Sequence, residues 1–293
     1  MAASASILPV IQQRYSCRNY TSTPLNDDTQ RAVSDYLQQL PAGPFQKSNR
    51  FVLAAATDQE RSTLRGLGTY GFIKNPPAFI IGASEEGSLT LEDFGYCMEQ
   101  IVLQMTRLGL GTCWLGGTFT RSAFAQRLEA GRDEILPAVL SLGYPSQEDP
   151  QAMRLAQQLP VIRERIAWQA LFFEKSFDVP LTPEASGAYA TPLEMVRLAP
   201  SASNKQPWRI LRQGDRWHLY LQRTKGYREM ALGRFTGIAD MQRIDMGIAM
   251  CHFELAARDC GLSGKWMIDE PQIVRPDVLT HYVVSWVSDP SVL

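Results

Sequence analysis

One stretch of the chain is repeated. Residues 93–114, DFGYCMEQIVLQMTRLGLGTCW, match residues 245–266, DMGIAMCHFELAARDCGLSGKW, at seven of 22 positions with a constant offset of 152 residues. About one or two identities are expected by chance from average composition. A shared apolar helical pattern does not explain a repeated Gly-Leu pair and a repeated tryptophan. These pairs are Gly109/Gly261, Leu110/Leu262 and Trp114/Trp266. We interpret the repeat as an internal duplication.

Each copy is predicted to be a long, buried helix that stops at its glycine and is followed by a strand. Further strands are expected on both sides of each helix, at 75–82 and 137–144 and again at 216–223 and 280–287. The period is too long for a solenoid, so we expect two related halves, 1–168 and 169–293, packed as a dimer within one chain. The first half includes a polar, partly helical connector at 147–168.

Composition excludes several classes of function. The 293 residues carry 29 basic and 30 acidic side chains, so no overall field attracts nucleic acid or a membrane surface. No apolar stretch approaches the length of a membrane span, and no basic region precedes the first apolar run. Five unevenly spaced cysteines and three scattered histidines favour neither disulfides nor a metal site, and we expect a cytoplasmic protein.

Near the start of the first half, RYSCR (14–18) places two arginines and a serine in alternation. In an extended chain Arg14, Ser16 and Arg18 project from one face. Guanidinium groups bind phosphate through paired, charge-assisted hydrogen bonds, so these residues form a candidate anion site. A solvated basic strand has the same spacing, and the stretch alone leaves both interpretations open.

In the second half, APSASNKQPW (199–208) places small polar residues between two prolines. The comparable place in the first half holds LPAGPFQKSN (40–49), which lacks the polar pattern. Conversely, ALFFEKSFDVPL (170–181), aligned with residues 14–25 through a shared Pro-Leu, has no basic triad. We therefore expect one composite site, with its anion donors from the first half and a polar rim from the second, and a second site that does not bind phosphate.

Together with GLGTCWLGG and LGYP, these motifs resemble the FMN-dependent nitroreductases, in particular the branch in which two nitroreductase-like halves are fused. The resemblance spans nearly the whole chain, and APSASNKQPW is its most specific motif. It implies an α+β fold, with antiparallel sheet wrapped by helices and two tandem halves forming an intrachain pseudo-dimer. FMN is expected where the two halves meet. A single chain would then suffice, as a monomer.

The resemblance also implies roles for individual residues. The phosphate and ribityl chain of FMN would be held by Arg14, Tyr15, Ser16 and Arg18, with further basic groups from Arg163 and Arg165. The edge of the flavin ring would be lined by Pro200, Ser201, Ala202, Ser203 and Asn204, in a loop fixed by Gln206. Backbone N–H groups beside the ring would come from Leu115, Gly116 and Gly117, where glycine permits close approach. Tyr15 replaces an arginine that the family pattern often carries, which would weaken retention of FMN.

The activity implied is ping-pong oxidation of NAD(P)H, with reduction of nitroaromatics, quinones or similar flat small molecules. No side chain is nominated as an essential acid or base, because the hydride chemistry belongs to the cofactor. A non-catalytic protein of this fold, binding flavin or another ligand as a sensor or carrier, is the alternative. Measured turnover of NAD(P)H separates the two.

Other motifs have simpler interpretations. GLGTYG (66–71) matches a dinucleotide-binding pattern, but it lacks the preceding strand and following helix that such a site needs. Cys113 is expected to be a buried structural cysteine, and His252 a hydrogen-bonded core histidine. Trp114 and Trp208 are expected to pack at loop ends.

Overall fold

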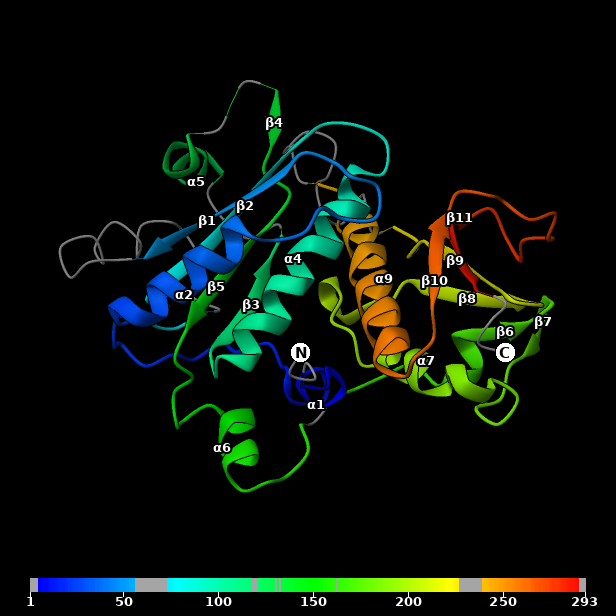
Figure 1. Cartoon of the computed structure of the whole chain (residues 1–293), viewed down its shortest axis with the longest axis horizontal. Helices are drawn as coiled ribbons and strands as arrows, with labels where there is room; N and C mark the ends of the chain where they lie inside the picture. The colour runs from blue at the N-terminus through cyan, green and yellow to red at the C-terminus, as the bar shows by residue number, and fades with distance from the viewer. Residues whose placement is uncertain are drawn as a thin grey trace.

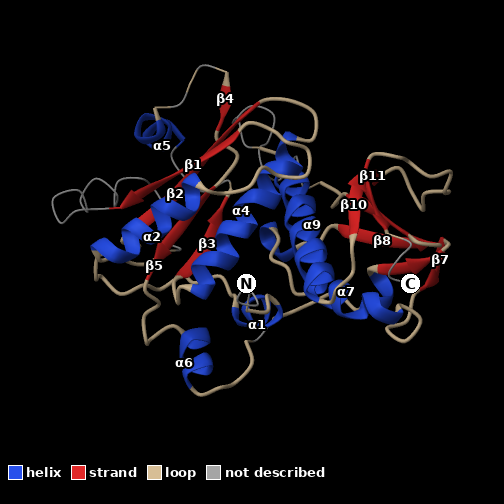
Figure 2. Ribbon diagram, viewed as in Figure 1, coloured by secondary structure: helices blue, strands red, loops and turns tan. Residues whose placement is uncertain are grey.

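Two β-sheets lie on either side of a pair of long helices. The computed structural model describes residues 5–55, 73–116, 121–129, 131, 133–161, 163–226 and 239–289. Figure 1 shows α4 (Thr90–Arg107) and α9 (Met241–Asp259) side by side at the centre, and Figure 2 shows one group of strands on each side of them. The mixed α and β content and the antiparallel sheets agree with the predicted fold class.

The first sheet is formed by the first half of the chain and is antiparallel throughout. Its strand order is β1-β2-β5-β3, with β4 paired to β2. The central strands are continuous apolar runs because both of their faces are buried. The strands are β1 (Asn49–Ala55), β2 (Ala78–Glu85), β3 (Gly111–Leu115), β4 (Glu134–Ile135) and β5 (Val139–Gly143), and the accompanying helices are α1 (Leu8–Gln13), α2 (Asp27–Gln38), α5 (Arg121–Leu128) and α6 (Pro150–Ala156).

The second sheet has the strand order β10-β11-β9-β8-β6-β7 and one parallel pair, β6 with β8. Its first four strands occur in the same spatial order as β3-β5-β2-β1, and each set carries its long helix at the same place in the sequence. The elements are β6 (Phe172–Glu174), β7 (Ser176–Pro180), α7 (Ala190–Arg197), β8 (Trp208–Gln213), β9 (Arg216–Gln222), β10 (Gly264–Met267) and β11 (Thr280–Ser288).

Both long helices end as the repeat predicts. Gly109 and Gly261 have φ of 73° and 75°, a left-handed conformation that ends a helix with little strain at glycine. In each case the following leucine N–H donates to a carbonyl five residues earlier, Leu110 to Met105 and Leu262 to Ala257, both at 2.9 Å. The four strands predicted around the helices are also confirmed, as β2, β5, β9 and β11. The strand expected at 75–82 begins only at Ala78, after Pro76-Pro77.

The segment at 170–181 is not placed as the sequence alignment suggested. Residues 14–20 run beside β3, through a bridge between Ser16 and Thr112. Residues 172–180 instead form the β6-β7 hairpin beside β8, at the opposite edge of its sheet. The shared Pro-Leu therefore does not mark equivalent positions. Glu174 lies in this hairpin, and its carboxylate forms an ion pair with the guanidinium of Arg212 at 3.9 Å. The pairing of Arg14, Ser16 and Arg18 with Ala170, Phe172 and Glu174 was wrong.

Within the described part of the chain, no helix has the length and apolar character needed to cross a bilayer. Each half contributes to one large core, which runs from α1 through α4 and α9 to the inner faces of both sheets. A smaller apolar cluster fills the space under α5.

Candidate functional site

The segment 14–20 is held against β3 by backbone hydrogen bonds, including Cys17 N–H to Thr112 O at 2.9 Å. The predicted alternation agrees with the structure, since Arg14, Ser16 and Arg18 all lie close enough to Cys113 to influence the pKa of its thiol. Burial nevertheless raises the pKa of Cys113, so the thiol form is favoured, as expected for a structural cysteine. Tyr15 projects to the other side and contacts Cys17.

Arg14 is a buried cation with open hydrogen-bonding capacity. Its side chain is 4% exposed, and its Nε has no hydrogen-bond partner among the described residues. Burial lowers its pKa, while Glu99, with Oε1 4.0 Å from Nε, acts in the opposite direction. Arg18, in contrast, is exposed. A buried guanidinium with an unpaired N–H favours an anion beside it.

The connector brings Arg163 and Arg165 to Arg14. Burial and then the charge of Arg14 lower the pKa of Arg163 to about 9 and that of Arg165 to about 10. Arg163 donates to the backbone carbonyls of Ile11 and Gln12, at 3.1 and 2.8 Å, and to that of Arg14. The Nε atoms of both connector arginines are buried and have no partner among the described residues. Three guanidiniums therefore share one region of positive potential.

Arg165 also joins this region to the polar rim of the second half. One of its terminal nitrogens donates to Asn204 Oδ1 at 2.8 Å, and the other donates to Leu198 O at 3.0 Å. The Gln206 side chain accepts from Ile166 N–H at 2.9 Å and donates to Asn204 O at 3.1 Å. Gln206 thus fixes the rim against the connector. Sequence spacing had placed the anion donors and the rim in different halves, and the structure joins them through residues 163–166.

The rim backbone is strained and internally bonded. Ser203, Asn204 and Gln206 have φ between 48° and 54°, which non-glycine residues seldom adopt. Ser201 accepts a hydrogen bond from Gln206 N–H at 2.8 Å, and Pro200 is buried at the start of the loop. Strain held by such bonds is common where a loop is shaped for a ligand.

A repeated aspartate anchors the equivalent loop in each half. Asp93 accepts hydrogen bonds from Phe45 N–H, Lys47 N–H and the Asn49 amide, at 2.6, 3.0 and 3.1 Å. Asp245 accepts only one, from Ala202 N–H at 2.9 Å, and its Oδ2 is buried without a partner among the described residues. Burial raises the pKa of Asp245 well above its ordinary value.

The CWLGG motif contacts the second half of the chain at α9. Leu115 is buried, and a side chain at Gly116 would overlap the thioether of Met241. Met241 and Asp245 are one turn apart in α9, so the same helix contacts Gly116 and holds the rim at Ala202. Gly117 and GLGTYG (66–71) lie outside the described residues, and the expectations for them stay predictions.

Sequence reasoning missed a buried polar network around Glu99. Trp114 Nε1 donates to Glu99 Oε2 at 2.9 Å, and His252 Nε2 lies 2.9 Å from Oε1. His252 is a satisfied core histidine, as predicted, whereas Trp114 has a polar role in addition to packing. The sequence signal was a glutamate close to the apolar residues Met98 and Ile101 in the middle of the helix, where burial leaves a carboxyl group in need of partners.

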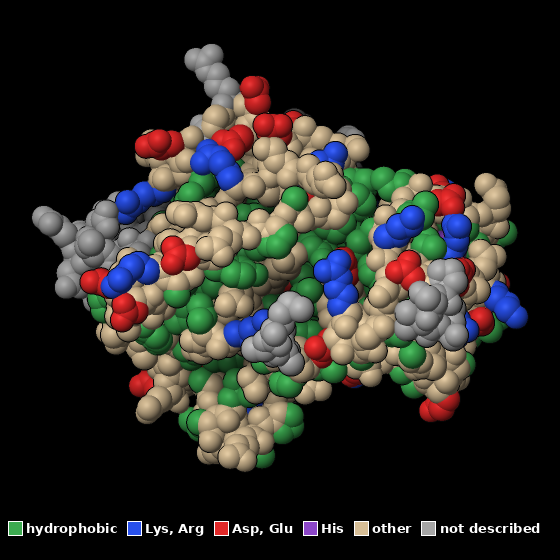
Figure 3. Space-filling view, viewed as in Figure 1, with side chains coloured by type: hydrophobic (Ala, Val, Ile, Leu, Met, Phe, Trp, Pro, Cys, Tyr) green, Lys and Arg blue, Asp and Glu red, His purple; other side chains and the backbone are tan. Residues whose placement is uncertain are grey.

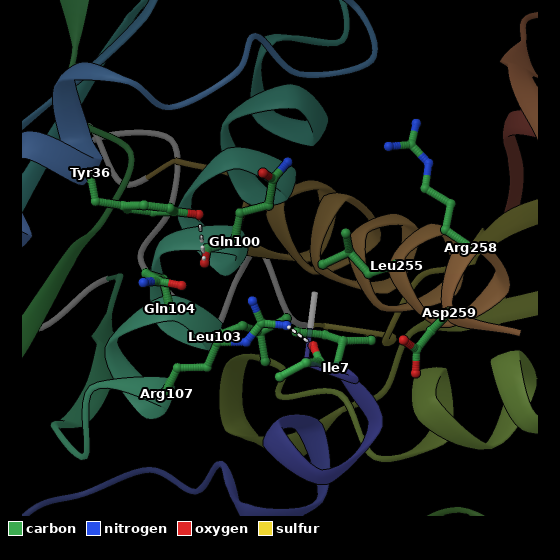
Figure 4. Close-up of a pocket in the computed structure, with 10 residues that line it drawn as sticks. Ile7, Tyr36, Gln100, Leu103, Gln104, Arg107, Leu255, Arg258 and Asp259 are labelled. Carbon is green, nitrogen blue, oxygen red and sulfur yellow. Dashed lines mark hydrogen bonds between the residues drawn. The ribbon is translucent and has the colours of Figure 1, made fainter. Parts of the chain in front are cut away.

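Two hollows lie near these elements. One, of about 230 Å³, is lined by Arg14 and Tyr15 together with Gln13, Thr106, Gly109, Leu110, Gly111, Pro145, Ala152 and Leu155. The other, of about 330 Å³, lies at the C-terminal ends of α4 and α9 (Figure 4) and has none of the predicted site residues in its lining. Figure 3 shows hydrophobic and basic side chains at the centre of this face. Because only the smaller hollow is lined by predicted site residues, Arg14 and Tyr15, we take Arg14 and the rim as the candidate site.

A comparison with protein families finds one match over most of the chain. The family described as "Putative TM nitroreductase" matches residues 6–257. No match was found among curated proteins.

One solved structure has the same fold over the whole chain. A "putative nitroreductase" from Thermotoga maritima has a TM-score of 0.61 and 20% identity, covering 99% of this chain and 97% of that one. Shorter nitroreductases match about half of the chain. A Desulfitobacterium hafniense nitroreductase with bound FMN covers 50% of this chain and 93% of its own, at 20% identity and a TM-score of 0.43. A Clostridium difficile FMN-dependent nitroreductase covers 48% and 88%, at 20% identity and a TM-score of 0.40.

Proposed function

Because the chain belongs to the putative TM nitroreductase family, we propose that it binds one FMN and uses it to oxidise NAD(P)H and reduce small flat acceptors such as nitroaromatics or quinones. FMN would lie between the 14–18 segment and CWLGG of the first half and the 200–206 rim of the second. The observation that carries the proposal is a cluster of three guanidiniums, Arg14, Arg163 and Arg165, whose buried Nε atoms have no partner among the described residues.

The residues present fit a phosphate monoester. Burial, followed by the charge of Arg14, lowers the pKa of Arg163 and of Arg165, and an anion at this place would relieve the repulsion between these cations. Arg14 and Arg18 would bind the phosphate directly, with Ser16 as a hydroxyl donor. Arg163 and Arg165 have committed their terminal nitrogens to carbonyl and amide oxygens, so they would contribute mainly their charge and the position of the segments they join.

The proposed site is composite and occurs once per chain. The shared strand order of the two sheets supports an internal duplication, with halves at 1–168 and 169–293 forming a pseudo-dimer across α4 and α9. Among the described residues, no segment pairs with the outer edge of β10 as residues 14–20 pair with β3. The described part of the second half therefore contains no element that would bring phosphate donors to an equivalent position.

When bound, FMN would supply the hydride-accepting and hydride-donating chemistry. The chain's own part is binding and orientation. Arg14 and Arg18 would fix the phosphate end, the Ser201–Asn204 loop would define one edge of the ring, and Gly116 would offer its backbone N–H near the ring. Gln206 and Asp245 would hold the loop in its strained conformation, so that the ligand does not have to order it.

Flavin stoichiometry and turnover test the proposal. We expect a bound flavin per chain near one after loading with excess FMN, and oxidation of NAD(P)H when a quinone or nitroaromatic is added. Bound flavin without turnover would favour the alternative of a non-catalytic flavin carrier. A ratio near two would contradict the single composite site.

A point variant adds a local test. Arg14→Ala should weaken FMN binding at least about tenfold, since a charge-assisted hydrogen bond contributes about 1.5–3 kcal/mol. The matched control is Arg212→Ala, because Arg212 lies at the hairpin edge of the second sheet beside Glu174. Equal losses in the two variants would count against the site.

A further inference from the structure

Glu99 is a buried acid that lies next to Arg14 of the candidate anion site. Its side chain is fully buried on α4, and its Oε1 lies 4.0 Å from Arg14 Nε. Trp114 of β3 donates to its other oxygen at 2.9 Å, and His252 of α9 lies 2.9 Å from Oε1. Arg14, Trp114 and His252, from three parts of the chain, therefore all lie against the Glu99 carboxyl group. Of these, Arg14 is the proposed phosphate-binding cation.

Hydrogen-bond geometry places a proton in this network. His252 Nδ1 is 2.9 Å from the carbonyl oxygen of Met195, and a carbonyl only accepts, so Nδ1 carries a hydrogen. The contact between His252 Nε2 and Glu99 Oε1 then needs a second hydrogen. Glu99 and His252 therefore share one hydrogen, and Arg14 lies beside the same carboxyl group. The Arg14 charge and the Trp114 N–H both stabilise negative charge on that carboxyl group.

We propose that Glu99 is the built-in counter-anion of Arg14 and that it competes with the phosphate group of the ligand, so that Glu99 and His252 together set the affinity of the site for phosphate-bearing ligands. The proposal rests on the proposed function, because it concerns the same Arg14 site. Two anions that share one cation repel each other, and the effect is strong where burial reduces solvent screening. Removing the carboxylate charge should therefore strengthen binding of the phosphate.

The two members of the pair should act with opposite signs. In Glu99→Gln, the new amide can still accept from Trp114 and donate to His252 Nε2, so the hydrogen-bond pattern persists while the negative charge beside Arg14 disappears. In His252→Gln, the Glu99 carboxyl group loses the imidazole with which it shares a hydrogen, so its negative charge should be felt more strongly at Arg14. A merely structural role would lower affinity in both variants.

FMN and riboflavin differ by the phosphate, so their affinities separate this effect from general damage. We expect Glu99→Gln to tighten FMN binding by about three- to tenfold and His252→Gln to weaken it by a similar factor, with riboflavin affinity changed less than twofold in both. The matched control is Glu254→Gln. Glu254 is also a buried helical acid that accepts a tryptophan N–H, from Trp266 at 2.6 Å, but it contacts Tyr96 and Arg258 instead of Arg14.

Dissociation constants from flavin fluorescence titration of the four proteins decide the matter. An unchanged ratio of FMN to riboflavin affinity in Glu99→Gln, or a ratio that falls, overturns the proposal. If the wild-type protein binds no FMN, the proposed function fails instead. The thermal stabilisation of the same proteins by inorganic phosphate, compared with chloride at equal ionic strength, then tests Glu99 alone. If Glu99→Gln does not fold, His252→Gln provides the test. The proposal then requires that phosphate stabilise His252→Gln less than wild type, and equal stabilisation overturns it.

Discussion

Gly95 of α4 lies against the backbone of Ile244 in α9, so closely that a methyl group on Gly95 would overlap the Ile244 carbonyl oxygen. Its counterpart in the repeat, Gly247, lies in the same way against the carbonyl of Glu92. The two glycines therefore let the repeated helices cross at backbone contact. This crossing sets the position of everything that α4 and α9 carry, including Glu99, Met241 and Asp245.

Gly95→Ala and Gly247→Ala should each destabilise the protein by about 1–3 kcal/mol or more, because the added methyl group has rigid backbone to displace. The free energy of unfolding from urea titration measures this. Gly87→Ala is the control, since the nearest atom to its new methyl would be the Thr90 hydroxyl oxygen at 3.2 Å. A loss at Gly95 no larger than that at Gly87 would contradict the close crossing.

Gln206→Ala should release the rim from the connector. The substitution removes the oxygen that accepts from Ile166 N–H and the amide that donates to Asn204 O. It leaves the partly buried Ile166 N–H unpaired, which costs about 1–3 kcal/mol of stability. We expect lower unfolding free energy together with weaker FMN binding. The control is Gln213→Ala, at the exposed end of β8. Unaltered FMN affinity in Gln206→Ala would argue against the rim as a ligand-binding loop.

Asp245 should make stability depend on pH. Burial raises its folded pKa well above the value of about 3.9 for an unfolded aspartate, so folding takes up a proton between those values. Its contribution to stability is therefore full below pH 4 and is lost as the pH rises, by at most about 1.4 kcal/mol per pH unit. Asp245→Asn cannot ionise, so its stability relative to wild type should improve from pH 5 to pH 7. Equal differences at the two pH values would show that Asp245 does not titrate in this way.

The ion pair between Arg50 of β1 and Glu134 of β4 should act in the opposite direction. Its two hydrogen bonds are both 2.6 Å long, and mainly through them Arg50 lowers the pKa of Glu134 to about 2. The stability it contributes is present above the unfolded value of about 4.3 and is lost as the pH falls toward 2. Partial exposure limits it to about 1 kcal/mol. Glu134→Gln should thus destabilise at pH 7 and converge on wild type only as the pH approaches 2, as followed by thermal melting.

Much of the local structure could be predicted because it depends on neighbours in the sequence. The repeated helices, their glycine stops and the flanking strands follow from apolar periodicity and from the conformations open to glycine. The projection of Arg14, Ser16 and Arg18 from one face also agrees with the structure, because it requires only an extended chain. The alignment of 170–181 with 14–25 failed because a shared Pro-Leu carries no information about which sheet edge a segment will join.

The sequence by itself determined the repeat, the types of the main elements and which residues are candidates for binding an anion. Only the tertiary structure decided that Arg163 and Arg165 meet Arg14, that Gln206 joins the rim to the connector, and that Glu99 lies between Arg14 and His252. Those contacts span 40 to 153 residues along the chain. They arise because two helices cross at paired glycines and bring distant charges into one buried region, where each polar group must find a partner.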